Sequence, residues 1–340
     1  MSDKRYLGNI ITDTPTAPAG PYENSAASGV WSLAEAFAYT KAGLWPTAGN
    51  AAPVTGLFGG GQIEGVGSTN SIEKIVIDTT GNSTDFGDLS RTTSRPSAVG
   101  STTRGIWMGG SQNVIDFVLF ATSGNATDFG DLLNTSSGAA SCSSSTRGVF
   151  SGGNIGSNTN VIQYIEMATA GNASDFGDLT LARKEFCGFS SPTRGVFAGG
   201  DTTSGETNIL DYITIASTGN ALDFGDISVA CYNNAAVSSS TRGVIQVAQT
   251  STYVNTLEYV TIASTGNTTD FGDAVSTIAN RGAVSSNTRG VFASGSTFAG
   301  STIYFNHIEY ITIASTGNGT DFGDMLFNSR WRTGCSSRAA

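Results

Sequence analysis

An acidic tetrapeptide, D-F-G-D, recurs six times and places carboxylates at a regular spacing along the chain. The copies begin at Asp85, Asp128, Asp175, Asp223, Asp270 and Asp321. Each copy follows a Gly-Asn pair, so that Asn172, Asp175 and Asp178 belong to one short loop. Carboxylate and amide oxygens are ligands that Ca²⁺ prefers, which makes structural calcium one interpretation. The alternative, which we favour, is that Asn and Asp cap backbone amides in a turn.

A second recurrent motif, T-R-G followed by apolar residues, places an arginine between successive acidic loops. Its arginines are Arg104, Arg147, Arg194, Arg242 and Arg289. The Cys-Ser-Ser-Arg sequence that ends at Arg338 resembles the same turn and supplies a sixth arginine. Six arginines match six acidic loops in number. We therefore predict ion pairs between these arginines and the first aspartates of the D-F-G-D loops.

Residues that could form a catalytic site are few. The chain has one histidine, His307, so that multi-histidine metal sites and Ser-His-Asp triads are hard to build. The four cysteines, at 142, 187, 231 and 335, form no C-x-x-C pair, and we interpret them as buried small side chains rather than disulfides. D-F-G also occurs in protein kinases, but no H-R-D motif or phosphate loop accompanies it here. We expect no enzymatic activity and no cofactor.

The repeated motifs require β-strands to position them. The run Ile209–Ile215 alternates apolar and polar residues, and a period of two is typical of a strand. Gly195–Gly200 is a second, shorter run, and the T-R-G and Gly-Asn segments are turns, because Gly and Asn tolerate positive φ. Four short strands in a repeat of about 47 residues fit one blade of a β-propeller.

The composition agrees with an all-β fold. Of 340 residues, 44 are glycine, 13% are charged and 39% are hydrophobic. This balance argues against coiled coils and helical bundles, and the lack of a G-x-y period excludes collagen. A disordered, low-complexity chain is the other interpretation, but a fixed period of alternating apolar positions does not fit it.

Charge and hydropathy narrow the classes of partner. The formal net charge is −10, whereas a nucleic-acid surface needs a basic footprint. No apolar run approaches the roughly 18 residues of a transmembrane helix, and the first residues lack the apolar segment of a secretory signal. We expect neither nucleic-acid binding nor membrane insertion.

The repeat predicts an all-β fold, a six-bladed propeller of four-stranded blades over residues 51–340, after an N-terminal segment of residues 1–50. The first repeat begins with its second strand, at about Thr55–Gly60. The chain ends on a segment like a first strand, at about residues 331–337. We therefore predict that the C-terminal strand completes the first blade, with Arg338 beside Gly56, and so removes the open sheet edges.

Several of these features resemble kelch repeats. They are the glycine pair after an apolar strand (Gly199 and Gly200), a tyrosine in the next strand (Tyr212), and an arginine after the fourth strand (Arg183, Arg330). The usual kelch tryptophan is absent, and the Phe of D-F-G-D is expected to pack in its place. The T-R-G-V-F-x-G-G and T-D-F-G-D sequences are similar to repeats of tail-fibre and other structural proteins of marine tailed bacteriophages. The resemblance covers about residues 50–340 and implies a kelch-like virion protein.

Residues 1–50 differ from the repeats. Met1–Asn24 is rich in Pro and Thr and predicts an extended arm. Residues 32–42 predict a short helix with a capping box between Ser32 and Glu35, followed by Gly43. The apolar residues proposed for docking are Trp31, Leu33, Phe37 and Trp45. One interpretation is a plug that packs on the propeller; the other is a docking element for a neighbouring virion subunit, because this segment also resembles phage tail-fibre and adhesin-like proteins.

Loops that differ between repeats are the candidates for binding, since a rigid frame with varied loops is a common arrangement for recognition. The candidate residues are Lys184, Phe186, Tyr232, Asn233, Arg281, Phe298, Tyr304, Phe305, Trp331 and Arg332. Aromatic rings together with Asn and Arg suit contact with a sugar or a protein. The alternative is that these loops have drifted without a binding role.

The sequence therefore predicts a non-enzymatic virion protein of the tail or fibre apparatus, part of a larger assembly. We expect residues 1–50 to contact other virion proteins and the variable loops to contact a glycan or protein of the host surface. Two alternatives stay open: a capsid-associated decoration protein of the same fold, and a free carbohydrate-binding lectin.

Overall fold

The computed structural model describes residues 31–42, 44–45 and 53–338. The chain divides into two units between Pro53 and Val54, and each is considered by itself. The predicted arm, Met1–Asn24, and Gly43 lie outside the described residues. In the first unit, helix α1 spans Leu33–Lys41. The hydroxyl of Ser32 accepts from the N–H of Glu35 (3.2 Å), whose carboxylate accepts from the N–H of Ser32 (2.9 Å), so the predicted helix and capping box are confirmed.

The second unit consists of antiparallel strands in successive sets of four. The first set contains, in order of pairing, β27 (Thr333–Ser336), β1 (Thr55–Gly59), β3 (Gly67–Val76) and β4 (Thr84–Thr93). Gly56 lies opposite Ser336, and the N–H of Ser337 donates to the carbonyl of Thr55 (2.9 Å). The prediction that the C-terminal strand completes the first repeat is confirmed.

The remaining sets follow in chain order. The second is β5 (Pro96–Gly100), β6 (Arg104–Gly109), β7 (Gln112–Leu119) and β8 (Thr127–Ser136). The third is β9 (Ala140–Ser143), β10 (Arg147–Ser151), β11 (Val161–Glu166) and β12 (Ser174–Asp178). The fourth is β13 (Cys187–Ser190), β14 (Arg194–Ala198), β16 (Gly205–Thr214) and β17 (Leu222–Cys231), with the short β15 (Asp201–Thr202) paired to β16.

The last two sets complete the unit. The fifth is β18 (Ala235–Ser238), β19 (Arg242–Gln246), β20 (Thr256–Thr261) and β21 (Thr269–Asp273). The sixth is β22 (Gly282–Ser285), β23 (Arg289–Ala293), β25 (Thr302–Thr312) and β26 (Thr320–Arg330), with β24 (Ser296–Phe298) paired to β25.

These strands form five sheets within residues 53–338, whereas the repeat predicted one separate sheet for each blade. The ten-stranded sheet contains both the first and the sixth set. The short strand β2 (Gln62–Ile63) joins them, because it pairs with β3 on one side and with the far end of the long β26 on the other.

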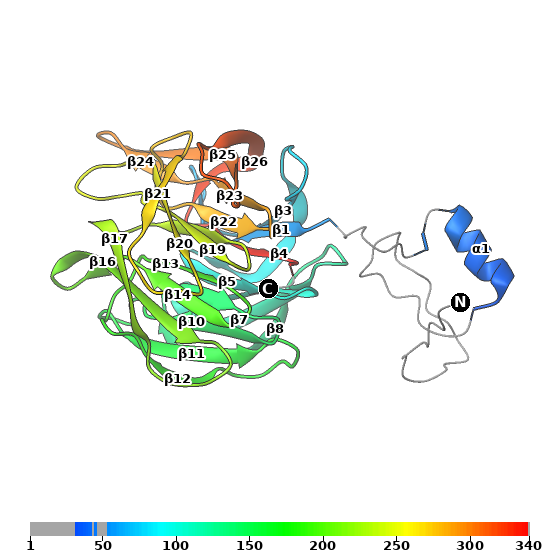
Figure 1. The fold of residues 1–340 in the computed structure, drawn as a ribbon, viewed down its shortest axis with the longest axis horizontal. Helices are drawn as coiled ribbons and strands as arrows, with labels where there is room; N and C mark the ends of the chain where they lie inside the picture. Colours follow the sequence, from blue (N-terminus) through cyan, green and yellow to red (C-terminus); the bar gives the residue numbers. More distant parts are fainter. Residues whose placement is uncertain (1–30, 43, 46–52, 339–340) are drawn as a thin grey trace. The chain divides into compact units, whose positions relative to one another are not determined.

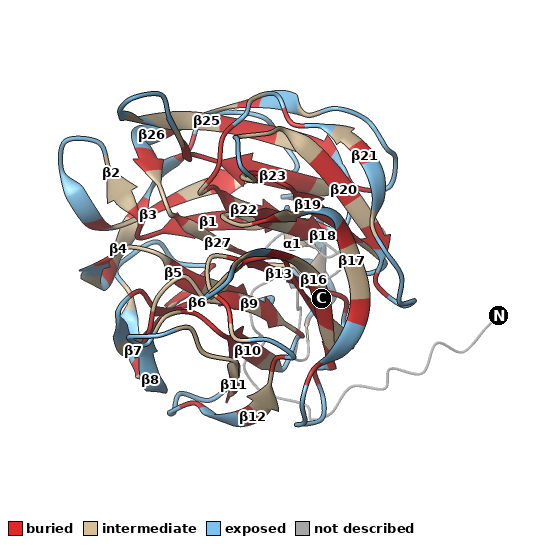
Figure 2. Cartoon of the chain, turned by 90° about the vertical axis from the view of Figure 1, so that its left-hand side faces the viewer, coloured by how far each residue is buried: buried red, intermediate tan, exposed pale blue. Residues whose placement is uncertain are grey.

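The sheets form a ring like that of a β-propeller (Figure 1). The first strands of the sets contact one another in a closed cycle, from β27 through β5, β9, β13, β18 and β22 back to β27. Figure 2 shows buried residues along the strands and exposed residues at the loops. The general fold class predicted from the repeat, an all-β propeller, is therefore confirmed.

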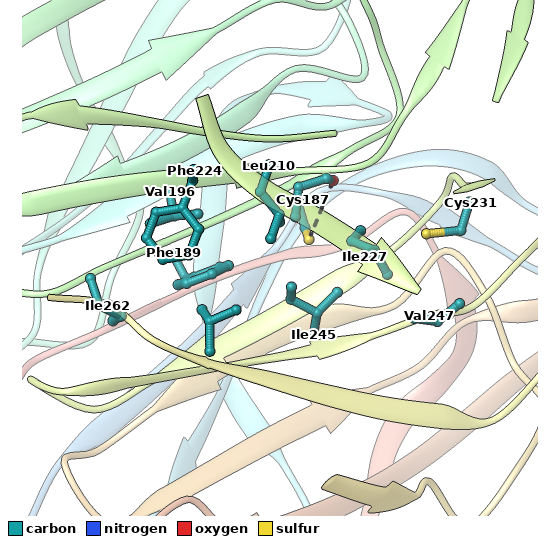
Figure 3. Packing of buried hydrophobic residues seen from close by; sticks show 12 residues of the cluster. Cys187, Phe189, Val196, Leu210, Phe224, Ile227, Cys231, Ile245, Val247 and Ile262 are labelled. Atoms are coloured by element: carbon teal, nitrogen blue, oxygen red, sulfur yellow. Dashed lines mark hydrogen bonds between the residues drawn. The ribbon is translucent and has the colours of Figure 1, made fainter. Parts of the chain in front are cut away.

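The core lies between neighbouring sets. In one cluster, Phe189 and Phe224 of the fourth set pack with Ile245 of the fifth (Figure 3). The Phe of each D-F-G-D is buried, and Phe224 packs edge-to-face on Tyr212 at a centroid distance of 6.0 Å. Because each cluster draws on two sets, no set can bury its apolar faces alone, and closure of the ring is needed to complete the core.

The cysteines belong to these clusters. All four are free thiols and buried, which confirms their predicted role as small core side chains. Burial raises the pKa of each thiol, and that of Cys231 to about 12. Thiols held in the protonated form are poor nucleophiles.

Candidate binding site

The two ends of the ring carry different connections. We call "turn face" the end with the T-R-G and Gly-Asn turns, and "loop face" the end where the second strand leads to the third and the fourth leads to the next set. Because strands within a set alternate in direction, all turns of one kind lie at the same end. The repeated motifs therefore lie on the turn face, and the variable candidate residues lie on the loop face.

On the turn face, the asparagine of each Gly-Asn pair joins two sets. The Oδ1 of Asn172 in the third set accepts from the N–H of Asp131 in the second (3.0 Å). The same bond recurs around the unit and passes from the last set to the first, where Asn82 accepts from the N–H of Asp324 (3.0 Å). The other pairs are Asn125 with Asp88, Asn220 with Asp178, Asn267 with Asp226 and Asn318 with Asp273. The interpretation of asparagine as an amide cap is therefore correct, with the detail that it caps the neighbouring set.

The predicted ion pairs between turn arginines and the D-F-G-D aspartates are wrong. Arg194 instead donates to the carbonyl of Ile262 in the next set (2.9 Å) and lies over the ring of Tyr212 (4.4 Å). Arg104, Arg147, Arg242 and Arg289 make equivalent carbonyl and ring contacts. The predicted partners Asp85, Asp128, Asp175, Asp223, Asp270 and Asp321 are all exposed. Water solvates these carboxylates well, so little drives them toward an arginine that already satisfies a carbonyl.

Arg338 departs from the other turn arginines. Its guanidinium donates to the hydroxyl of Ser238 (2.9 Å) and to the carbonyls of Ser238 and Ser190. It enters a small cavity of about 80 Å³ between the first strands of the sets. Burial lowers the pKa of Arg338 to about 10.

At the loop face, each set begins with a residue in the left-handed region at the same structural position. We call these residues the axial ring: Arg95, Gly138, Glu185, Asn233, Asn280 and Trp331, with φ between 54° and 67°. Each N–H after the first donates to the carbonyl of the preceding member, for example Glu185 to Gly138 (2.6 Å) and Trp331 to Asn280 (2.9 Å). Gly and Asn adopt this conformation easily, whereas Arg95, Glu185 and Trp331 do so at a cost of about 1–3 kcal/mol each.

The side chains of the axial ring contact one another across the loop face. Arg95 forms an ion pair with Glu185, and its guanidinium lies 3.9 Å from the ring centroid of Trp331. Arg330 lies 3.6 Å from the Trp331 ring, and the indole N–H donates to Oδ1 of Asn280 (2.6 Å). These contacts fix the orientation of Trp331.

A cavity of about 760 Å³ opens beside the axial ring. Four predicted binding residues line it: Tyr232, Asn233, Phe298 and Trp331. The lining also includes residues that were not among the predicted binding residues: Arg95, Glu185, Asn280, Arg330 and Tyr253. The signal for three of these was present, because Arg95, Glu185 and Asn280 follow the fourth strand at the same distance from their repeat motifs as Asn233 and Trp331.

Three predicted binding residues are buried and serve the core. Arg281 pairs with Glu309 (2.5 Å), Arg332 pairs with Glu73 (2.7 Å), and Phe186 packs edge-to-face on Phe197. Arg183–Asp211 (2.9 Å) and Arg91–Asp116 (2.7 Å) are also buried ion pairs to the third strand of the next set. Arg183 follows the fourth strand of its set, whereas Arg91 lies within the fourth strand, β4. A buried guanidinium must be paired, so these arginines are unavailable to a ligand.

The remaining predicted residues lie outside the cavity. Lys184 pairs with Asp201 (3.3 Å), and the hydroxyl of Tyr304 donates to Gln62 (3.4 Å). The N–H of Phe305 donates to the carbonyl of Gly295 (3.0 Å). The structure therefore does not bring these three together with Trp331 in one site.

The predicted docking residues divide into two groups. Trp31 lies edge-to-face with Trp45 (5.5 Å) and with Tyr39 (5.2 Å), so both tryptophans belong to a small aromatic cluster. Leu33 and Phe37, one helical turn apart on α1, are 88% and 67% exposed.

Two searches of side-chain groups and helices cover the described residues. No group of three or more His, Cys, Asp or Glu side chains in that part of the chain could hold a metal ion. Asn172, considered above as a calcium ligand, already accepts from an amide. No helix there is long and apolar enough to cross a membrane.

A scan against protein-family models and a search of curated proteins both return no match.

Proposed function

We propose that this chain is a non-enzymatic binding protein whose loop face contacts a glycan or protein on a host surface. The observation that supports this most is the cavity of about 760 Å³ beside the axial ring. Pockets of this size bind small ligands, and rigid placement of their polar groups gives specificity. The three side chains held at a cost in backbone strain, Arg95, Glu185 and Trp331, all line this cavity. Strain of this kind clusters at functional sites.

The chemistry of the same cavity supports a binding role rather than a catalytic one. Among the described lining residues, its one carboxylate is that of Glu185, which is engaged by Arg95. Hydrolysis of a glycosidic bond by the common route needs two carboxyl groups on either side of the bond. The remaining lining residues carry guanidinium groups, aromatic rings, amides and hydroxyls, which are typical of ligand binding.

The number of blades and the biological context of the protein are also part of this proposal. We propose that the ring is a six-bladed, kelch-like propeller, with the ten-stranded sheet counted as two blades that β2 joins. Buried pairs such as Arg183–Asp211 support this reading, because in several sets an arginine within or after the fourth strand pairs with an acidic residue of a third strand. The motif resemblance favours a virion protein of a tailed bacteriophage, in the tail or fibre.

We also propose that residues 1–50 contact other virion proteins. The exposed Leu33 and Phe37 on α1 support this, because two large apolar side chains on one helical face are a typical contact for a partner. The chain would thus hold to the particle through one unit and present the loop face of the other.

Binding of labelled protein to an array of bacterial lipopolysaccharides and capsular polysaccharides tests the proposal. We expect saturable binding that weakens at least tenfold in Phe298→Ala, because this ring is 61% exposed and lines the cavity. Phe327→Ala is the matched control, since Phe327 is also exposed (45%) and lies outside the cavity. Equal weakening in both variants, or no binding to any polysaccharide or to bacterial cells, would contradict it.

A further inference from the structure

The cavity of about 760 Å³ beside the axial ring, which we call the axial cavity, is lined by more positive than negative side chains. Arg95 is paired with Glu185, but no carboxylate in the described part of the chain lies within 4 Å of the guanidinium of Arg330. The polar contacts of Arg330 are with the neutral Gln62, whose Oε1 accepts from its Nε (3.3 Å) and Nη2 (3.1 Å). The cavity therefore carries one uncompensated positive charge in a chain of net charge −10.

Arg330 is held in a fixed orientation. Its guanidinium stacks on Trp331 (3.6 Å) and lies over the ring of Tyr304 (4.8 Å), while Gln62 fixes one edge. A planar guanidinium fixed on aromatic rings presents its free N–H groups in a defined direction, and that geometry suits a planar carboxylate.

The remaining lining groups offer both donors and acceptors to hydroxyls. The amide N–H of Asn233 donates to Oε1 of Gln249 (3.0 Å), which leaves Oδ1 of Asn233 and the amide N–H groups of Gln249 for a ligand. Tyr232 and Tyr253 line the same cavity, as does Phe298, whose side chain is exposed. Alternating donors and acceptors beside aromatic rings match a sugar, which has hydroxyl edges and apolar C–H faces.

We propose that the axial cavity binds a saccharide that carries a carboxylate, with the carboxylate on Arg330 and the sugar ring against the Tyr232, Tyr253 and Phe298 side. This inference rests on the proposed function and specifies its ligand. Tyr232 lies within the electrostatic influence of Glu206, Glu185 and Asp201, and their negative charge disfavours a second anionic group beside Tyr232. The site thus selects a ligand with one negative end and one neutral end.

Isothermal titration with two probes tests the inference: an oligosaccharide with a glucuronic acid at its non-reducing end, and its neutral glucose counterpart. We expect the native protein to bind the acidic probe at least tenfold more tightly than the neutral one. Arg330→Gln should remove this preference, so that the acidic and neutral probes bind the variant with affinities within about twofold of each other. Lys184→Gln is the matched control, because it removes a positive charge from the loop face outside the cavity, and should change affinity less than twofold.

Two further measurements keep the outcomes distinct. Circular dichroism and thermal melting of Arg330→Gln check that the variant folds, and Arg330→Lys should recover part of the preference because the charge is restored without the planar fork. If the native protein binds polysaccharides but shows no preference for the acidic probe, this inference is overturned and the proposed function stands. If it binds neither probe and no polysaccharide or cell, the proposed function fails as well.

Discussion

Contacts between neighbouring sets differ in chemistry between the turn face and the loop face of the ring. On the turn face, neighbouring sets are joined by neutral acceptors, as in the bond from Asp131 to Asn172, and the pattern is the same around the unit. On the loop face, neighbouring sets are joined by buried ion pairs such as Arg183–Asp211, which only some sets possess. The repeated bonds of the turn face hold the sets together in the same way throughout, whereas the loops of the loop face differ between sets and can form a binding site.

The fourth set shows how much the loop face depends on its ion pairs. Arg183 and Asp211 are both fully buried, so Arg183→Met leaves a buried carboxylate without its partner. We expect a loss of about 3–5 kcal/mol in the free energy of unfolding, measured by urea denaturation. Arg194→Met on the turn face is the comparison, because it removes a partly exposed carbonyl and ring contact and should cost only about 1–2 kcal/mol. Equal losses would remove the distinction between the faces.

On the turn face, we expect the largest loss of stability where an added side chain would collide with the backbone of the next set. Gly177 in a D-F-G-D loop has φ of 146°, and a Cβ there would lie 2.5 Å from the backbone of Gly219 in the next set. Gly177→Ala should cost about 2–4 kcal/mol, measured by thermal or urea unfolding, because strain and overlap add. Gly171→Ala is the control, since nothing lies within 4 Å of its Cβ position and its φ is not in the left-handed region. A loss below about 1 kcal/mol for Gly177→Ala would show that the loops adjust freely.

The smallest expected effect is a change in the pH at which the phenol of Tyr232, on the loop face, ionises. Partial burial, followed by Glu206 and Glu185, raises the pKa of Tyr232. The folded chain therefore ionises Tyr232 at higher pH than the unfolded chain, and this contribution to stability is complete below the ordinary tyrosine pKa and declines as the pH rises above it. Absorbance at 295 nm should show that Tyr232→Phe removes a late-titrating group. In Glu206→Gln that group should titrate earlier; an unchanged titration in both variants would contradict the assignment.

Much of the fold could be predicted because it is local and repeated. Alternation such as Ile209–Ile215 and the Gly-Asn turns specify strand and turn without reference to distant residues. Closure by the C-terminal strand also followed, since the first repeat lacks its first strand and β27 supplies it. The joining of two sets by β2 could not be foreseen, because it depends on the end of β26 meeting Gln62 and Ile63 of the first set in space.

The candidate site was predicted only in part. Tyr232, Asn233, Phe298 and Trp331 do line one cavity, but Arg281 and Arg332, similar in sequence context, are buried against Glu309 and Glu73. Composition alone does not distinguish an arginine that faces solvent from one that neutralises a carboxylate in the core.

By itself, the sequence determined the repeat, the strands and turns, the buried thiols and the capped helix, because each depends on residues close together in the chain. Only the tertiary structure decided which side chains meet. Closure of the ring brings Arg95, Glu185 and Trp331, which are far apart in the sequence, to one axis. It likewise turns the predicted arginine–aspartate pairs into contacts with carbonyls of the next set. The physical reason is that such partners are chosen by burial and distance in space, which a one-dimensional pattern does not contain.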